Sequence, residues 1–195
     1  MEAIQLWDQS ISFGLQNIHN PFLDFIMPII SLISNEGIIW LVFGAALCIP
    51  RRYRKYGIMV FFAIGLSFIV GSVILKPLIA RPRPCDLFPD VPLLTEKPDG
   101  FSFPSGHTIA SFAGAAVIWM ANWRFGIPAM VLAALVGFSR IYLFAHFLTD
   151  VLAGAVLGIL CAIAMALLFR LALFLFRRIR GDKRGRHRGK HYDIS

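Results

Sequence analysis

Residues 57–75, GIMVFFAIGLSFIVGSVIL, form an uncharged apolar run. A helix needs about 20 such residues to cross the hydrocarbon core of a bilayer, where backbone groups find partners only within the helix. A second run, residues 147–169, contains one charged residue, Asp150, near its start. The composition of the whole chain is also typical of a membrane protein, with 57% hydrophobic residues and a mean hydropathy of +0.70. These features predict an integral membrane protein and argue against a water-soluble domain.

Four further stretches are apolar enough to be candidate spans, although several reach full length only with polar residues at one end. They are residues 20–34, 36–50, 104–121 and 126–144. We therefore expect an all-α integral membrane protein, a six-helix transmembrane bundle. The predicted organisation is an interfacial helix at 1–19, a transmembrane domain at 20–176 and a basic cytoplasmic tail at 177–195.

The first 19 residues carry apolar side chains at helical spacing with polar ones between them. The apolar positions are Ile4, Trp7, Ile11, Leu15 and Ile18. This pattern predicts an amphipathic helix in the membrane interface, and an ordinary packing helix fits it equally well. Glu2 and Asp8 stand where a signal peptide would be basic, so no cleavable signal is expected. The three cysteines lack the spacing of a zinc site or a disulfide framework.

The net charge is +8, and the positions of the cations predict the orientation. Arg51, Arg52, Arg54 and Lys55 follow the second span, Arg124 follows the fourth, and nine more lie between Arg170 and Lys190. Alternating spans place all of these on one side, which the positive-inside rule makes cytoplasmic. The other cations are Lys76, Arg81, Arg83, Lys97 and Arg140. These lie at the outer ends of spans, where a cation is costly and indicates a functional site.

The outer ends of the last four spans bring together a set of residues suited to phosphate. Lys76, Arg83 and Arg140 supply charge to neutralise a phosphoryl group. Ser105 and Gly106 begin a helix, where backbone N–H groups and the positive end of the dipole attract anions. The set predicts a phosphate cradle.

Two histidines complete this set. His146 is the predicted nucleophile, and Asp150, four residues later, is expected on the same helical face to orient it. His107 is the predicted general acid. The His–Asp pair also fits an ordinary helix-surface pair. A metal site on these three residues is disfavoured, because it would need a cation where Lys and Arg already gather.

Three motifs carry a family resemblance. Lys76 to Pro84 (KPLIARPRP) matches K-x6-R-P, Pro104 to His107 is PSGH, and Ser139 to Asp150 (SRIYLFAHFLTD) matches S-R-x5-H-x3-D. With these motifs the chain resembles the type-2 phosphatidic acid phosphatase family, whose members share a catalytic core with vanadium haloperoxidases and bacterial acid phosphatases.

The resemblance implies a role for each matched residue. Lys76, Arg83, Ser105, Gly106 and Arg140 would bind phosphate. His146 would become transiently phosphorylated, His107 would protonate the leaving group, and Asp150 would orient His146. Ser139 and Arg81 are possible further site residues, since the spacing selects Arg83 over Arg81. The resemblance also implies catalysis without a metal or other cofactor.

The expected activity is hydrolysis of a lipid phosphomonoester or diphosphate at the outer face of the plasma membrane. Phosphatidic acid, phosphatidylglycerol phosphate and undecaprenyl diphosphate are the candidate substrates, and the outward-facing site favours the last. Two alternatives stay open: phosphoryl transfer to an acceptor alcohol, and a non-catalytic lipid or anion binder or transporter. The loop at 85–102 is expected to be a lid or a solvated connector. The expected partners are the lipid substrate and membrane lipids, with no nucleic acid and no obligate protein partner.

Overall fold

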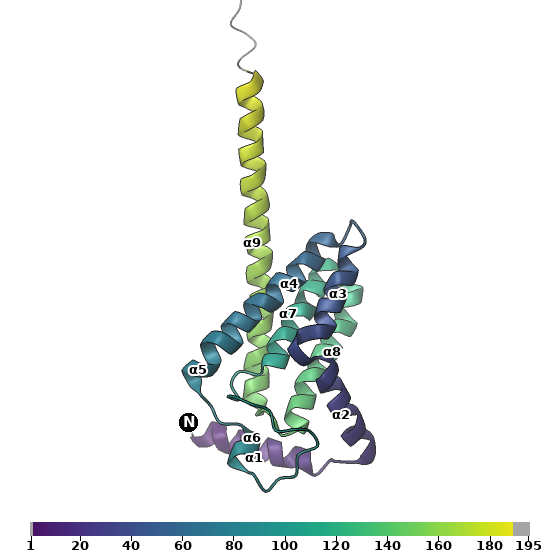
Figure 1. Cartoon of the computed structure of the whole chain (residues 1–195), viewed down its shortest axis with the longest axis vertical. Helices are drawn as coiled ribbons and strands as arrows, with labels where there is room; N and C mark the ends of the chain where they lie inside the picture. The colour runs from purple at the N-terminus through teal and green to yellow at the C-terminus, as the bar shows by residue number, and fades with distance from the viewer. Residues whose placement is uncertain (1, 189–195) are drawn as a thin grey trace, which may run out of the picture.

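The computed structural model describes residues 2–188, and in that range the regular structure is entirely helical. Figure 1 shows a bundle of α3, α4, α7, α8 and the first part of α9, with α1 lying across one end. The second part of α9 projects beyond the bundle at the opposite end. The prediction of an all-α protein is therefore confirmed for the described chain.

The helices follow one another with short connections. Their bounds are α1 (Glu2–Gln16), α2 (Pro21–Ile33), η1 (Asn35–Gly37), α3 (Ile38–Cys48), α4 (Arg54–Phe68), η2 (Ile69–Leu75), α5 (Lys76–Ile79), α6 (Pro84–Leu87), α7 (Gly106–Ala121), α8 (Trp123–Tyr142) and α9 (Leu148–Arg188). The stretch η2 is π-helical and joins α4 to α5 without a break. The long loop from 88 to 105 returns the chain to the start of α7.

Each of the six stretches expected to span the membrane is largely helical, but their lengths differ. Three helical segments in the described chain are long and apolar enough to cross a bilayer: Arg54–Leu87, Trp123–Tyr142 and Leu148–Ile179. The pair α2 and α3 would make a fourth span, bent by 56° at its break. The 16 residues of α7 extend about 24 Å, less than the roughly 30 Å of hydrocarbon. Three or four spans thus meet the length criterion.

The centre of the bundle is α7, which contacts α3, α4, α8 and α9. Its inner positions are small, and Ala113 and Ala115 are fully buried. Small residues let helix backbones approach closely, which matters in lipid because burial of apolar surface gives little advantage there. Trp40 of α3 fills the remaining space and donates from its indole nitrogen to the hydroxyl of Ser111 at 2.9 Å.

A Gly-x-x-x-Gly pair on α9, Gly154 and Gly158, sets the crossing of α9 with α7. A methyl group at Gly158 would lie 2.4 Å from the carbonyl oxygen of Ile109. At Gly154 it would lie 3.1 Å from the carbonyl oxygen of Ser105. The first turns of both helices are therefore held side by side, and these turns carry the predicted site residues.

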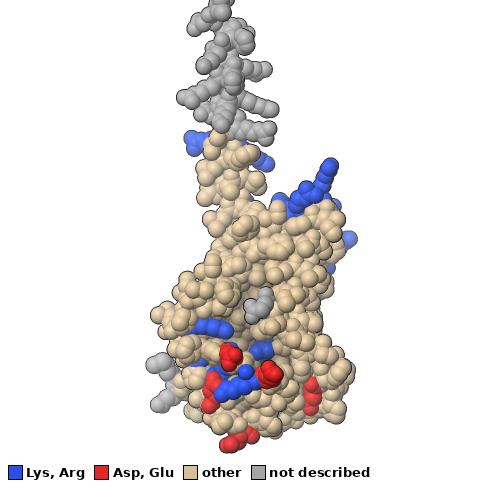
Figure 2. All heavy atoms as spheres, in the orientation of Figure 1, with Lys and Arg blue, Asp and Glu red and all other residues tan. Residues whose placement is uncertain are grey.

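Cations gather at two separated levels of the molecule. Figure 2 shows one group in a hollow near α5 and α6, mixed with acidic residues, and a second group at the far end of the bundle. The far group includes the loop between α3 and α4 and the start of α8. The tail boundary expected at 176 falls inside α9, which continues as a helix to Arg188. The described part of the predicted tail is thus helical, although it contains Gly181 and Gly185.

Replacement of Gly158 by alanine should destabilise the protein, because the new methyl group meets the backbone of α7. Overpacking of this kind costs about 1–3 kcal/mol. Gly65→Ala on α4 is the matched control, since a methyl group there meets nothing within 4 Å. Thermal unfolding in detergent should show a lower Tm for Gly158→Ala alone. Equal Tm values for the two variants would contradict the proposed crossing.

Candidate active site

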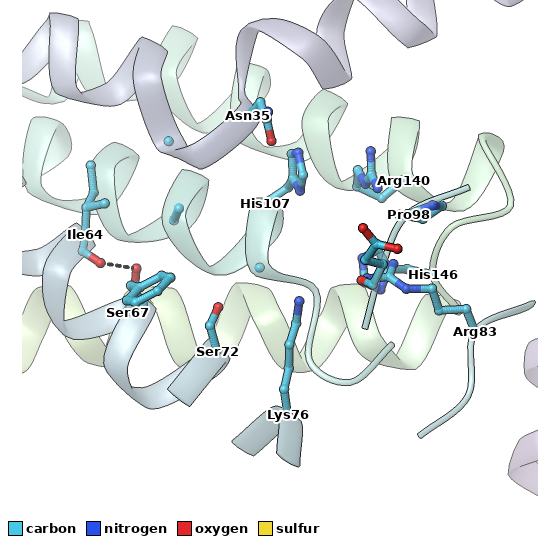
Figure 3. A pocket seen from close by; sticks show the side chains of 15 residues that line it. Asn35, Ile64, Ser67, Ser72, Lys76, Arg83, Pro98, His107, Arg140 and His146 are labelled. Atoms are coloured by element: carbon cyan, nitrogen blue, oxygen red, sulfur yellow. Dashed lines mark hydrogen bonds between the residues drawn. The ribbon is translucent and has the colours of Figure 1, made fainter. Parts of the chain in front are cut away.

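A cavity of about 400 Å³ opens between α4, η2, α7 and the loop before α7. Figure 3 shows Lys76, His107, Arg140 and His146 around this space. Its polar lining consists mainly of Lys76, Arg83, Asp99, His107, Arg140 and His146. Its other end is lined by Ile64, Phe68 and Ala110. The cavity therefore offers a cationic pocket continuous with an apolar one.

His146 lies in the turn that precedes α9, and not on that helix as the sequence suggested. The helix begins at Leu148, and the turn contains Phe144 with a left-handed φ of 56°. His146 is 2% exposed. Its Nδ1 lies 3.9 Å from Oδ2 of Asp150, too far for a direct hydrogen bond. The two residues face each other because the turn folds back, with the amide of Phe147 donating to Asp150 at 2.9 Å.

Ser102 fills the gap between these two side chains, a role that the sequence did not indicate. Its hydroxyl donates to Oδ2 of Asp150 at 2.5 Å and lies 3.4 Å from Nδ1 of His146. The side chain is fully buried. A single serine ahead of the PSGH motif carries no pattern that distinguishes it from an ordinary loop residue. Its role depends on the path of the loop.

The other ring nitrogen of His146 faces the cavity as an acceptor. Nη1 of Arg83 lies 3.2 Å from Nε2, and because a guanidinium only donates, Nε2 carries the lone pair. The ring proton is then on Nδ1, toward Ser102. Burial lowers the pKa of His146 to about 3, against the opposing effect of Asp150. The imidazole is therefore neutral near pH 7, and its Nε2 lone pair accepts from Arg83 at the wall of the cavity.

Arg83 is held mostly by protein acceptors. Its Nε donates to the carbonyl of Gly100 at 2.8 Å, and Nη2 donates to that of Asp99 at 2.8 Å. Nη1 also donates to the carbonyl of Ala145 at 3.0 Å. This guanidinium fastens the loop before α7 to the turn before α9. With Nη1 also bonded to His146, four of its five N–H groups are occupied, and one on Nη2 remains for a phosphate.

Arg140, near the end of α8, is the cation with an unused donor. It is 7% exposed, and Nη1 donates to the hydroxyl of Ser31 on α2. Its Nε is buried with no hydrogen-bond partner among the described residues. A buried donor without a partner costs about 1–3 kcal/mol. An anion in the cavity would remove this cost.

The two small residues of the PSGH motif, at the start of α7, have different surroundings. Gly106 lines the cavity, and a methyl group added there would lie 3.9 Å from Nζ of Lys76. Ser105 lies outside the lining and is fully buried. Its amide donates to the carbonyl of Asp150 at 3.2 Å, and its hydroxyl accepts from Thr108 at 2.9 Å. Ser105 thus positions the helix start, while Gly106 faces the site.

Two further predicted residues also lie outside the cavity lining. Ser139 is buried and donates to the carbonyl of Val136 at 2.7 Å, within α8. Arg81 binds Asp8 at 2.7 Å and Asp150 at 2.6 Å. It lines a smaller cavity of about 230 Å³ with residues of α1. In the described chain, no three His, Cys, Asp or Glu side chains are grouped as metal ligands would be.

The chain matches known proteins over most of its length. It is 35% identical over 126 residues to an undecaprenyl-diphosphatase of Sulfolobus acidocaldarius, covering 62% of this chain and 58% of that protein. It is 33% identical over 172 residues to phosphatidylglycerophosphatase B of Bacillus subtilis, covering 81% of each. Among solved structures, a PAP2-type phosphatidylglycerolphosphate phosphatase of B. subtilis aligns with a TM-score of 0.73. That alignment has 28% identity and covers 87% of this chain and 88% of the other.

The family model described as the PAP2 superfamily matches residues 38–174. This range contains the three motifs and every predicted site residue, from Lys76 to Asp150. By this match the chain belongs to the PAP2 superfamily, the type-2 phosphatidic acid phosphatases.

Proposed function

We propose that this protein is an integral membrane phosphatase that hydrolyses the phosphate of a lipid through a phosphohistidine intermediate. The observation that carries the proposal is the pairing of two groups at one cavity. A buried Nε of Arg140 has no hydrogen-bond partner among the described residues, and Nε2 of His146, which accepts from Arg83, carries its lone pair at the same cavity. Phosphoryl transfer needs a positioned nucleophile and donors for the charged oxygens. A binder would need the cations but not the nucleophile.

The first step transfers the phosphoryl group to His146. Lys76, Arg140 and the amide of Gly106 hold its oxygens, and Nε2 attacks the phosphorus opposite the lipid oxygen. The N–P bond forms as the P–O bond to the lipid breaks. His107 gives its proton to the leaving oxygen. The imidazole, now positive, keeps its Nδ1 proton toward Ser102 and Asp150.

The second step returns the enzyme to its starting state. A water molecule attacks the phosphorus from the side that the lipid oxygen has left, and His107 takes one of its protons. The N–P bond breaks, inorganic phosphate leaves, and Nε2 regains its lone pair. Water is the acceptor in this scheme. An alcohol bound at the same place would make the protein a phosphotransferase, which is the competing enzymatic proposal.

We place the active site at the extracytoplasmic face of the plasma membrane, with six helices across the bilayer and α1 in the interface. The far cation group, which includes Arg124 at the start of α8, supports a cytoplasmic location for that end of the bundle. The cavity lies at the opposite end, near α5 and α6. The C-terminal part of α9 would then be cytoplasmic.

The substrate class follows from the two ends of the cavity. The cationic end receives the phosphate, and Ile64, Phe68 and Ala110 provide an apolar surface for the adjoining lipid. The names of the relatives suggest undecaprenyl diphosphate and phosphatidylglycerol phosphate, with phosphatidic acid as a third candidate. An outward-facing site favours the diphosphate carrier lipid.

The purified protein should release phosphate from at least one of these three lipids in detergent with EDTA present. His146→Ala should abolish release, because it removes the proposed attacking nitrogen, Nε2. A colorimetric phosphate assay compares the two proteins, and product analysis with added glycerol separates hydrolysis from transfer. If wild type releases nothing, or if His146→Ala keeps full activity, the phosphatase proposal is wrong.

Gly106→Ala should fold normally and lose most of its activity. The new methyl group would meet nothing closer than 3.9 Å, so stability is unaffected, but the methyl occupies the place of a phosphate oxygen. A displacement of the substrate by about 1 Å can cost about 100-fold in rate. Gly65→Ala, remote from the cavity, is the matched control. Wild-type kcat/KM in Gly106→Ala would argue against phosphate binding at this helix start.

The ring of His146 should stay neutral when the pH is lowered. A histidine with a lowered pKa remains unprotonated until the pH approaches that pKa, about 3 here, whereas a free histidine titrates near 6.5. Long-range ¹H–¹⁵N NMR in micelles, with His146→Gln to assign the signals, should show the neutral pattern from about pH 7 to about pH 5. Protonation near pH 6.5 would contradict the buried, lone-pair-bearing nucleophile.

A further inference from the structure

A chain of three charges, two of them fully buried, connects α1 to the catalytic aspartate. Asp8 on α1 and Asp150 on α9 are both fully buried, and the guanidinium of Arg81 lies between them. Nη2 donates to Asp8 at 2.7 Å, and Nη1 donates to Asp150 at 2.6 Å. The ring of Phe147 packs 4.3 Å below the guanidinium. One arginine thus serves two carboxylates from opposite ends of the sequence.

Asp8 is held as firmly as Asp150. Its Oδ1 accepts from the amide of Thr149 at 3.0 Å, and its Oδ2 accepts from the hydroxyl of the same residue. The same hydroxyl accepts from Nη1 of Arg81 at 2.7 Å. A buried carboxylate is retained only where such donors compensate for its lost hydration. The first turn of α9 and the middle of α1 are therefore joined by a polar contact in an otherwise apolar protein.

This chain of charges lies behind the nucleophile and not in the substrate cavity. Neither Asp8 nor Arg81 lines the cavity of His146, and Arg81 borders the smaller cavity next to α1. The order of contacts runs from Asp8 to Arg81, Asp150, Ser102 and His146. A change at its outer end therefore reaches the imidazole from behind, through Asp150 and the turn around it, and not through the substrate cavity.

We propose that Asp8 and Arg81 are positioning residues for the phosphatase reaction, which hold Asp150 toward His146 and make the catalytic site depend on the docking of α1. The inference rests on the proposed phosphatase function and adds two residues to its machinery. Arg81 was a possible phosphate ligand by sequence, and the contacts assign it instead to the support of Asp150. Asp8 lies before the residues that the family model matches.

Arg81 and Asp8 each have a distinct electrostatic effect on Asp150. Phosphorylated His146 carries a positive ring, which the carboxylate of Asp150 stabilises. Arg81 fixes that carboxylate in place, and Asp8 shares the guanidinium charge so that Asp150 is not fully neutralised. The other charged or titratable groups that face Asp150 are His146 and, at longer range, Arg83. Loss of Arg81 would leave two buried carboxylates together, and one of them would take up a proton more readily.

The test measures kcat, KM and Tm for five variants with the best lipid substrate in detergent. Arg81→Gln should lower kcat by about 100-fold, the cost of about 1 Å of misplacement, with KM changed less than about twofold. In the plot of kcat against pH, the fall in kcat on the acid side should move to higher pH for Arg81→Gln. Both proteins are compared on the same substrate, so the ionisation of the substrate phosphate affects them equally. Asp8→Asn should lower kcat by about 10-fold. Arg81→Lys should recover part of the loss, because it restores the charge without the fork.

Lys97→Gln is the matched control. It removes one cation near the site, from an ion pair with Asp86 at 2.6 Å in which the lysine is 57% exposed. Exposed pairs contribute little, so kcat and its pH profile should match wild type. The double variant Asp8→Asn/Arg81→Gln should be no slower than Arg81→Gln alone, because the two residues act through one contact.

The outcomes separate the inference from the function on which it rests. An active wild type with Arg81→Gln and Asp8→Asn at wild-type kcat and pH profile would overturn the positioning role and leave the phosphatase intact. Equal changes in kcat from Lys97→Gln would also overturn it. A wild type without activity would overturn both. If Arg81→Gln fails to fold, Asp8→Asn and Arg81→Lys decide, since Asp8→Asn keeps the shape of the side chain and Arg81→Lys keeps the charge.

Discussion

The carboxylate of Asp150 is the group on which the rest of the site depends. It accepts hydrogen bonds from Arg81, Ser102 and the amide of Phe147, which come from three separate parts of the chain. The backbone carbonyl of Asp150 accepts from the amide of Ser105 at the start of α7. A carboxylate buried in this way is stable only if all of these donors stay in place. This requirement fixes three parts of the chain at one carboxylate: the loop before α7, the turn before α9 and, through Arg81, α1.

Close helix packing makes this arrangement possible. Gly154 and Gly158 bring α9 within backbone contact of α7, so that the two helix starts share the carbonyl-to-amide bond between Asp150 and Ser105. In lipid such packing substitutes for the hydrophobic effect, which does not draw helices together there. The short length of α7 belongs to the same design. Its first turns, with Gly106, His107 and Ala110, line the cavity.

The sequence predicted which residues come together at one cavity, but it predicted the contacts between them incompletely. Lys76, His107, Arg140 and His146 were assigned to one pocket from motif spacing and alternating spans, and they line one cavity. Ser102 was missed, because a loop serine has no periodicity, and its contact with Asp150 depends on tertiary folding. The helical i, i+4 relation of His146 and Asp150 was wrong, since the turn with Phe144 at positive φ ends before α9 begins. Spacing alone does not distinguish a helix from such a turn.

Counting cations in the sequence also overstated the number that face the substrate. Arg83 donates hydrogen bonds to the carbonyls of Gly100, Asp99 and Ala145. Arg81 donates to two carboxylates. Arginine suits this work because its planar fork joins several acceptors at once, which lysine does not do. A loop at the end of a membrane helix bundle must be fixed without a large apolar core beneath it. Two of the arginines near the site therefore hold the loops, and Arg140, with a buried donor unused, is the one whose chemistry is reserved for an anion.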